Sequence, residues 1–361
     1  SKMDEDVLTK RREGFIKYFK SQPYLLIYIA LGLIAWFGYS IRTRNLGLLY
    51  DVTTGDYIPV ALDPFVFLRY VEDIVANGTL MAVDTLRYFP EGFSRLAEFK
   101  IVSYTVAYFY KFLNFFDPSV TVAYAHVIYP AVAFVFGLVA FFFLMRSIFN
   151  WKVALLGSGF LTVLPAYLYR TMAGFSDKEA LAMIFMFVGL MLVAKFMYEK
   201  RFKWAAVYAA LAGLDVAALW LIWGGAGFLI LTIGVFFIGV VMLGRLTKKN
   251  LYLYSIFMAV FVFVYQVGFA ERAGSLIDIE TSLITSHFSG MLFLALVLAW
   301  LHYLLFMKDV FKIKEKVKIP HTYASLAVLA LLGFIAISIW VGPSYIWQQI
   351  GVVFTLLTSP Q

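Results

Sequence analysis

The feature that most constrains this chain is a series of nine long apolar stretches separated by short polar segments. They cover approximately residues 24–41, 121–145, 153–169, 179–197, 204–222, 226–244, 250–269, 290–307 and 322–341. A helix that crosses a bilayer needs about 20 mostly apolar residues. The chain is 62% hydrophobic and only 14% charged, which is far from the composition of a soluble domain. It is therefore predicted to be an all-α polytopic membrane protein with about nine spans.

The distribution of basic residues predicts the orientation of these spans. If the N-terminus is cytoplasmic and the spans alternate, 20 of the 30 Lys and Arg residues lie in cytoplasmic segments. This is the positive-inside bias that orients membrane proteins. We expect a multi-pass protein of the cell membrane with a cytoplasmic N-terminus. The formal net charge of +8 then reflects anchoring at the membrane surface, and no nucleic acid is expected as a partner.

The same topology predicts long external segments in which polar groups gather. They lie at about 42–120 (external loop 1), 170–178 (external loop 2) and 270–289 (external loop 4). Residues 99–116 are apolar enough to be scored as a further span, but counting them would place the later basic loops outside. We therefore predict an amphipathic or interfacial helix here, within external loop 1.

External loop 1 carries Asp63 immediately before Pro64, with Arg69 a few residues later. Proline is favoured in the first turn of a helix, and aspartate is a favoured N-cap. The sequence thus predicts a helix that starts with Asp63 as its cap. A solvated helix with a capping aspartate and a helix that presents functional side chains both fit this pattern.

External loop 2 carries two carboxylates, Asp177 and Glu179, shortly after Arg170. Two carboxylates at this spacing can point to one side and bind a divalent ion such as Mg²⁺ or Mn²⁺, which prefer oxygen ligands. Acidic residues at this position would also complement the dipole at a helix start. Further along, Trp223-Gly224-Gly225 follows the fifth predicted span, where glycines can let a ligand approach or simply form a turn.

Taken together, these segments resemble the catalytic subunits of oligosaccharyltransferases, the PglB and AglB group of bacteria and archaea. The family carries an Asp followed by an aromatic-and-Arg helix in its first external loop, and residues 63–78 are similar to it. The run Arg170-Thr171-Met172-Ala173-Gly174-Phe175-Ser176-Asp177-Lys178-Glu179 closely resembles the family's second-loop motif. Trp223-Gly224-Gly225 resembles the family's Trp-Gly-Gly.

The resemblance implies a GT-C-type glycosyltransferase membrane domain followed by a soluble domain with a Trp-Trp-Asp-Tyr-Gly motif. That motif does not occur in the printed sequence, and neither does the family's third acidic motif after the ninth span. We therefore expect residues 1–361 to form the transmembrane catalytic domain. A C-terminal soluble domain, absent from this chain, or a partner chain would supply the rest.

The resemblance also implies a reaction and roles for individual residues. The family transfers an oligosaccharide from a dolichyl phosphate or pyrophosphate to the Asn of an Asn-x-Ser/Thr sequon in an acceptor polypeptide, at the external membrane face. Asp63, Asp177 and Glu179 would be the ligands of Mg²⁺ or Mn²⁺, and Arg170 would orient the carboxylates or meet the lipid phosphate. Arg69 and Trp223-Gly224-Gly225 would contact substrate.

Two other classes of protein remain open at this point. Other GT-C enzymes that use polyprenyl-phosphate sugars, for O-mannosyl or aminosugar transfer, also keep an acidic residue in a large first external loop. A secondary transporter is a non-enzyme alternative, but transporters usually show internal repeats and polar groups near the membrane midplane. Here only Asp215 is an acid within a predicted span.

Overall fold

The computed structural model describes residues 23–94, 100–269, 286, 288–340, 342, 344, 347, 348 and 351. The first elements are α2 (Pro23–Arg42), η1 (Leu46–Leu48), β1 (Tyr50–Asp51), β2 (Asp56–Tyr57), α3 (Leu62–Asn77), β3 (Val83–Asp84), β4 (Phe93–Ser94) and α4 (Ile101–Phe116). Next come α5 (Val122–Ile148), α6 (Trp151–Val163), α7 (Pro165–Thr171), α8 (Lys178–Tyr198) and α9 (Phe202–Ile222). The last are α10 (Ala226–Met242), α11 (Lys248–Phe269), α13 (Ser289–His302), η3 (Tyr303–Met307) and α14 (His321–Trp340).

The helices confirm an all-α polytopic membrane protein. Within the described ranges, seven helices are long and apolar enough to cross a membrane, or eight if α6 and α7 form one broken span. The sixth predicted span is the shorter apolar helix α10. The exact number of spans stays a prediction, as does their orientation.

The α6–α7 pair is bent by 65° at its break. Pro165 occupies the first turn of α7, and Leu164 before it is extended, with a ψ angle of 116°. A proline disfavours helical backbone at the residue that precedes it, which explains why the helix is interrupted here. The bend leads the chain directly into residues 170–177.

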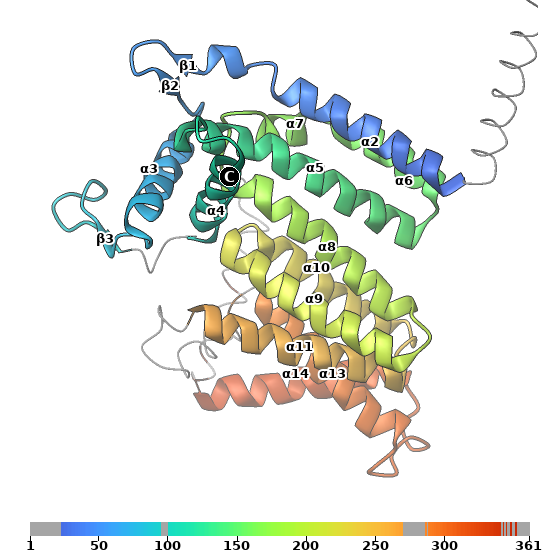
Figure 1. Cartoon of the computed structure of the whole chain (residues 1–361). Coiled ribbons are helices and arrows are strands. Elements are labelled where there is room, and N and C mark those ends of the chain that lie inside the picture. Colours follow the sequence, from blue (N-terminus) through green and yellow to red (C-terminus); the bar gives the residue numbers. More distant parts are fainter. Residues whose placement is uncertain are drawn as a thin grey trace, which may run out of the picture. The chain divides into compact units, whose positions relative to one another are not determined.

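Residues 99–116 were predicted to be a helix within the first external loop. The described part of this segment forms α4, which packs against α3 and α5 (Figure 1). Its buried side chains are Val102, Ser103, Val106 and Ala107, whereas Phe112, Phe115 and Phe116 are exposed. Burial is thus confined to one side of the helix, but the exposed side carries phenylalanines, so an amphipathic character and a place at a membrane interface both stay predictions.

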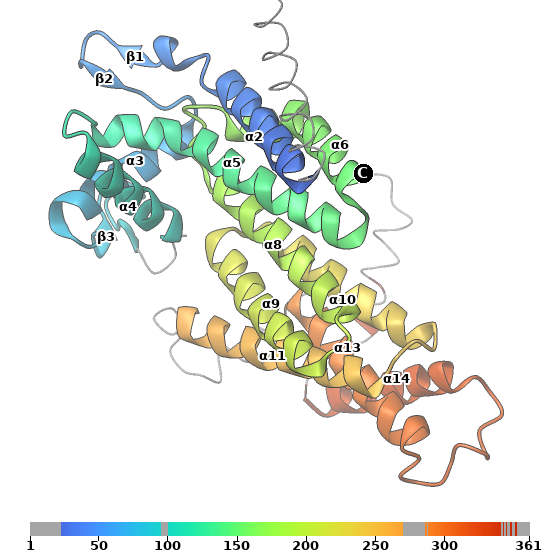
Figure 2. The same cartoon turned by 45° about the vertical axis from the view of Figure 1, so that its right-hand side comes forward.

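The chain divides into two compact units, each with its own core. Unit 1 comprises residues 1–226 and 259–276, and its core packs α2, α5, α6, α7 and α8 around Phe134, Leu138, Phe142 and Tyr167. Helices α8 and α9 are joined by a short loop and run antiparallel side by side (Figure 2). Every site residue predicted from the sequence lies in unit 1.

Unit 2 comprises residues 227–258 and 277–361. Its core brings together Val241, Leu251, Leu298 and Leu329 from four helices. The Tyr254 ring stacks on Phe237 at 3.9 Å, and its hydroxyl donates a hydrogen bond of 2.9 Å to a backbone carbonyl of α13. Of the predicted external loop 4, residues 270–285 and 287 lie outside the described residues.

Candidate active site

The second external loop is fixed by backbone hydrogen bonds to three different parts of unit 1. The Ala173 N–H donates to the carbonyl of Arg42, and the Gly174 N–H donates to the carbonyl of Val127, both at 2.8 Å. The Gly174 carbonyl accepts from the Val60 N–H at 3.0 Å. The loop is therefore tied to the end of α2, to α5 and to external loop 1.

Gly174 permits this close packing because of its backbone conformation and its lack of a side chain. Its φ angle is +89°, a value that residues with a Cβ rarely adopt. A Cβ built at this position would lie 2.6 Å from a Val60 methyl and 2.8 Å from a Leu49 methyl. The glycine of the Arg-Thr-Met-Ala-Gly run thus has a structural reason that the sequence did not reveal.

Arg42 is a supporting residue that the sequence analysis missed. Its side chain is completely buried and donates to the Thr171 hydroxyl at 2.7 Å and to the Thr162 carbonyl at 3.0 Å. The guanidinium carbon lies 3.4 Å from the centre of the Phe134 ring. Because both the backbone and the side chain of Arg42 contact residues 162–173, this arginine positions the segment that leads to Asp177.

The helix that carries Asp63 begins two residues earlier than the sequence predicted. Ala61 is the N-cap of α3 and makes no side-chain cap bond, so the prediction of Asp63 as the cap was wrong. Asp63 lies in the first turn with its side chain 66% exposed. Its carboxylate therefore does not cap its own helix, although an acid in the first turn complements the helix dipole.

His126 links the two external loops. Its ring Nε2 lies 2.9 Å from the Pro64 carbonyl, which can only accept, so this nitrogen carries the proton and donates. The His126 backbone carbonyl accepts from the Ser176 hydroxyl. One buried residue of α5 thus holds the start of α3 on one side and the start of α8 on the other.

As a result, the acidic residues of the two loops lie close together. The Lys178 ammonium is 4.0 Å from an Asp63 carboxylate oxygen and 3.8 Å from an Asp177 carboxylate oxygen. The two carboxylate oxygens are therefore no farther apart than the sum of these distances. The structure brings together Asp63 and Asp177, which are far apart in the sequence.

Asp177 and Glu179 occupy different local positions at the start of α8. Asp177 is the N-cap, and its carboxylate accepts from the Lys178 N–H at 2.6 Å, so the helix-start explanation holds for this residue. Glu179 lies in the first turn, 3.4 Å from the Arg170 guanidinium. Its second oxygen, Oε2, is buried and makes no hydrogen bond. A buried carboxylate oxygen without a partner is costly unless something else completes it.

The carboxylate oxygens are suitable ligands for a hard divalent cation. Their positions in this structure do not form a complete metal site. Mg²⁺ and Mn²⁺ prefer oxygen ligands, and the buried Oε2 of Glu179 lacks a partner that a cation could supply. However, no three His, Cys, Asp or Glu side chains in the described part of the chain are grouped so as to hold a metal ion. A shared ion requires the side chains of Asp63 and Asp177 to turn toward each other.

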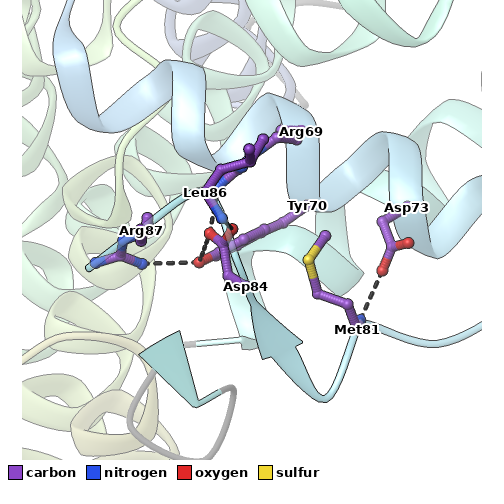
Figure 3. Close-up of polar contacts among 7 residues, drawn as sticks. All are labelled: Arg69, Tyr70, Asp73, Met81, Asp84, Leu86 and Arg87. Atoms are coloured by element: carbon purple, nitrogen blue, oxygen red, sulfur yellow. Dashed lines mark hydrogen bonds and ion pairs between the residues drawn. The ribbon is translucent and has the colours of Figure 1, made fainter. Parts of the chain in front are cut away.

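Arg69 contacts a different cluster, in the tip of external loop 1 (Figure 3). It forms an ion pair with Asp84, whose carboxylate also accepts from the Tyr70 hydroxyl at 3.0 Å and from the Leu86 N–H at 3.0 Å. Arg87 donates to the same Tyr70 hydroxyl at 2.7 Å. Burial raises the pKa of Tyr70, which keeps the hydroxyl protonated as a donor.

These contacts give Arg69 a structural role in the loop. A substrate-binding role for Arg69 stays a prediction. Asp84 is buried and was missed by the sequence analysis, because nothing in its local sequence shows that it faces α3.

Trp223-Gly224-Gly225 forms a turn between α9 and α10. The Ala226 N–H donates to the Trp223 carbonyl at 3.1 Å, and a Cβ at Gly225 would meet the Trp223 ring at 2.2 Å. The indole therefore folds back over the turn. Because α8 and α9 are antiparallel neighbours, this turn lies at the same end of the pair as Asp177, but a role in substrate binding stays a prediction.

Fold and site together define a polytopic helical membrane protein in which acidic residues from two loops lie close together at the starts of α3 and α8. A family model described as oligosaccharyl transferase STT3, N-terminal, matches residues 26–359. The chain therefore belongs to the STT3 oligosaccharyltransferase family, and this membrane fold is the one expected from the sequence.

Curated and solved proteins agree with this assignment. The dolichyl-phosphooligosaccharide-protein glycotransferase of Methanococcus voltae is 27% identical over 201 residues, which are 52% of this chain and 22% of the relative. The chain thus spans only about a fifth of the length of this relative.

The oligosaccharyltransferase of Archaeoglobus fulgidus has a similar fold in several solved states. The AglB complex with an inhibitory peptide and a dolichol-phosphate has a TM-score of 0.68 at 17% identity, and covers 95% of this chain and 40% of that one. The complex with zinc and sulfate has a TM-score of 0.62 at 17% identity, and covers 90% and 43%. The form tethered to an acceptor peptide with an NVT sequon has a TM-score of 0.66 at 17% identity, and covers 90% and 39%.

Proposed function

We propose that this chain is the membrane-embedded catalytic part of an enzyme that transfers a lipid-linked oligosaccharide to asparagine in Asn-x-Ser/Thr sequons. The observation that carries the proposal is the approach of Asp63 to Asp177 through Lys178, between two loops more than a hundred residues apart. The archaeal enzyme of similar fold binds a dolichol-phosphate in one structure and a sequon peptide in another. Both ligands match the donor and acceptor proposed here.

The chemistry explains why carboxylates are needed at this place. A bond forms between the asparagine amide nitrogen and the anomeric carbon of the sugar, while the bond from that carbon to the phosphate oxygen breaks. The amide nitrogen is a weak nucleophile, so positioning must supply much of the rate. Asp63, whose side chain is exposed, would accept a hydrogen bond from the acceptor amide and then the proton that this nitrogen loses as the new bond forms.

Arg170 and the acids of external loop 2 would stabilise the phosphate leaving group. The Arg170 side chain is 47% exposed while its guanidinium contacts Glu179, so it can reach an anionic phosphate without leaving the site. Asp63, Asp177 and Glu179 would hold a divalent cation, Mg²⁺ or Mn²⁺. When bound, the cation neutralises charge on the departing phosphate.

The proposal is tested in the complete protein that contains this chain, with a lipid-linked oligosaccharide and an Asn-x-Thr peptide. Asp63→Asn and Asp177→Asn are expected to reduce glycopeptide formation to background, whereas Glu91→Gln, an exposed acid of the same external loop, should leave it unchanged. Chelation of divalent cations should stop transfer, and Mn²⁺ or Mg²⁺ should restore it. Near-native turnover in both aspartate variants would contradict the assignment, and sugar linked to Ser or Thr would favour the O-mannosyl alternative.

The proposed external position of the site can be tested because the chain contains no cysteine. Single substitutions Thr53→Cys, in external loop 1, and Lys200→Cys, between α8 and α9, place one thiol at each expected side of the membrane. An impermeant maleimide added to intact cells should label the first and not the second. The reverse pattern would place the acids on the cytoplasmic side and would contradict the proposed topology.

A further inference from the structure

We propose that Lys178 is a built-in counter-ion of the acidic site, and that its ammonium group competes with the divalent cation for Asp63 and Asp177. The inference deepens the proposed function and rests on it, because it takes these two carboxylates as metal ligands. It gives Lys178, the middle residue of the acidic-x-acidic motif, the role of a positioning residue.

The position of the ammonium group carries the proposal. It lies 4.0 Å from Asp63 and 3.8 Å from Asp177, and 5.1 Å from the centre of the Phe67 ring on α3. The side chain is only 19% exposed, so water screens these charges less than it would on an open surface. Lys178 therefore joins the two loops electrostatically at the place where a shared metal ion would have to sit.

The backbone of Lys178 is held, whereas its charged end can move. Its N–H is bound by the Asp177 carboxylate, and the loop before it is tied to three other segments. A lysine side chain carries its charge on a flexible four-carbon stem, so the ammonium can turn away without any backbone change. A divalent cation that binds between Asp63 and Asp177 then replaces the single positive charge of Lys178 by two positive charges. The ion pairs of Lys178 with Asp63 and Asp177 are lost.

Removal of the Lys178 ammonium is expected to lower stability without metal and to raise the affinity for metal. Without metal, removal of the ammonium leaves Asp63 and Asp177 near each other with less compensation, which destabilises this end of the molecule. With metal, the same removal abolishes the competition and strengthens binding. A lysine that serves only as a structural contact would show the first effect and not the second.

The test uses Mn²⁺ as the probe, titrated into the purified complete protein that contains this chain and followed by the electron paramagnetic resonance signal of unbound Mn²⁺. Lys178→Met is expected to bind Mn²⁺ about tenfold more tightly than the wild type, as two weak ion pairs no longer compete. The same variant should unfold at a lower temperature in a chelating buffer. Lys178→Arg keeps the charge and should bind Mn²⁺ within about twofold of the wild type.

Lys152→Met is the matched control, because it also removes one positive charge but lies exposed at the other end of the α6–α7 pair. It should change neither Mn²⁺ affinity nor the unfolding temperature in chelator. An unchanged or weaker Mn²⁺ affinity of Lys178→Met, or no binding at all, would overturn the inference.

The outcomes also separate this inference from the proposed function. Tighter Mn²⁺ binding by Lys178→Met, lost when Asp177→Asn is added, supports the competition even if the complete protein fails to glycosylate a sequon. Conversely, sequon glycosylation that needs Asp63 and Asp177, with no effect of Lys178→Met on Mn²⁺ affinity, supports the function and rejects the competition.

Discussion

The structure holds the side chains of Asp177 and Asp63, which come from two different loops, in very different ways. Asp177 caps α8 and is buried, at the end of a loop tied by backbone hydrogen bonds to α2, α5 and external loop 1. Asp63 lies in the first turn of α3 with its side chain 66% exposed, and its carboxylate forms an ion pair with Lys178. The backbone is held by hydrogen bonds at both acids, but only the Asp177 side chain is also fixed by a hydrogen bond, whereas the Asp63 side chain is positioned by charge.

This difference suits a site that must admit substrates. Asp177 and its loop keep their charges in place without reorganisation during the reaction. The exposed Asp63 side chain can respond to a metal ion or to an acceptor peptide. Substitutions that loosen the second external loop are therefore expected to lower the free energy of unfolding much more than substitutions at Asp63.

The largest effect is expected from Arg42→Ala. The substitution removes a buried cation that contacts Thr171, Thr162 and the Phe134 ring, and leaves the hydrogen-bond acceptors unpaired. Each buried acceptor left unpaired costs about 1–3 kcal/mol. Thermal unfolding in detergent should show a strong destabilisation, whereas Arg44→Ala, two residues later and exposed, should change stability by less than about 0.5 kcal/mol.

The next largest effect is expected from Gly174→Ala. The added Cβ meets Val60 and Leu49 at less than 3 Å, in a backbone conformation that already disfavours alanine. We expect a loss of about 2–3 kcal/mol. Gly78→Ala is the control, because its φ angle is +78° but no atom lies within 4 Å of the new Cβ, and it should cost only about 1 kcal/mol. Equal costs would show that the packing around Gly174 does not matter.

A smaller and more local effect is expected from Asp84→Asn. It removes the charge that pairs with Arg69 and weakens the acceptor used by Tyr70 and Leu86. The expected cost is about 1–2 kcal/mol. Hydrogen exchange should become faster in residues 80–94 and remain unchanged in residues 172–177. Faster exchange in both segments would mean that the two loops are not independently held.

The smallest effect is expected at Asp63. Its exposed ion pair should contribute less than about 0.5 kcal/mol in the absence of metal, so Asp63→Ala should hardly change the unfolding temperature. Asp177→Ala removes a helix cap and should cost about 1 kcal/mol. If Asp63→Ala were the more destabilising of the two, the distinction between a fixed Asp177 side chain and an Asp63 side chain positioned by charge would be wrong.

The sequence predicted the long helices well, because the length of an apolar stretch is a local pattern. Charge asymmetry predicted that α4 is not a span, and its 16 residues make it shorter than the seven long apolar helices. The roles of the acidic pair stay predictions. The predicted cap, Asp63, lies two residues after the observed cap, Ala61, since helix starts are set by backbone geometry that proline alone does not define. Arg42 and Asp84 were missed because Thr171 and Arg69, with which they pair, lie 129 and 15 residues away.

The central claim is that Asp63 and Asp177 share one divalent cation. Crystals of the complete protein grown with Mn²⁺ allow the most direct measurement, an anomalous difference map at the manganese edge. The account predicts one strong peak within about 2.0–2.6 Å of carboxylate oxygens from both Asp63 and Asp177, with the Lys178 ammonium turned away. A peak bound elsewhere, or one that contacts Asp177 while Asp63 stays beyond ligand distance, would contradict it.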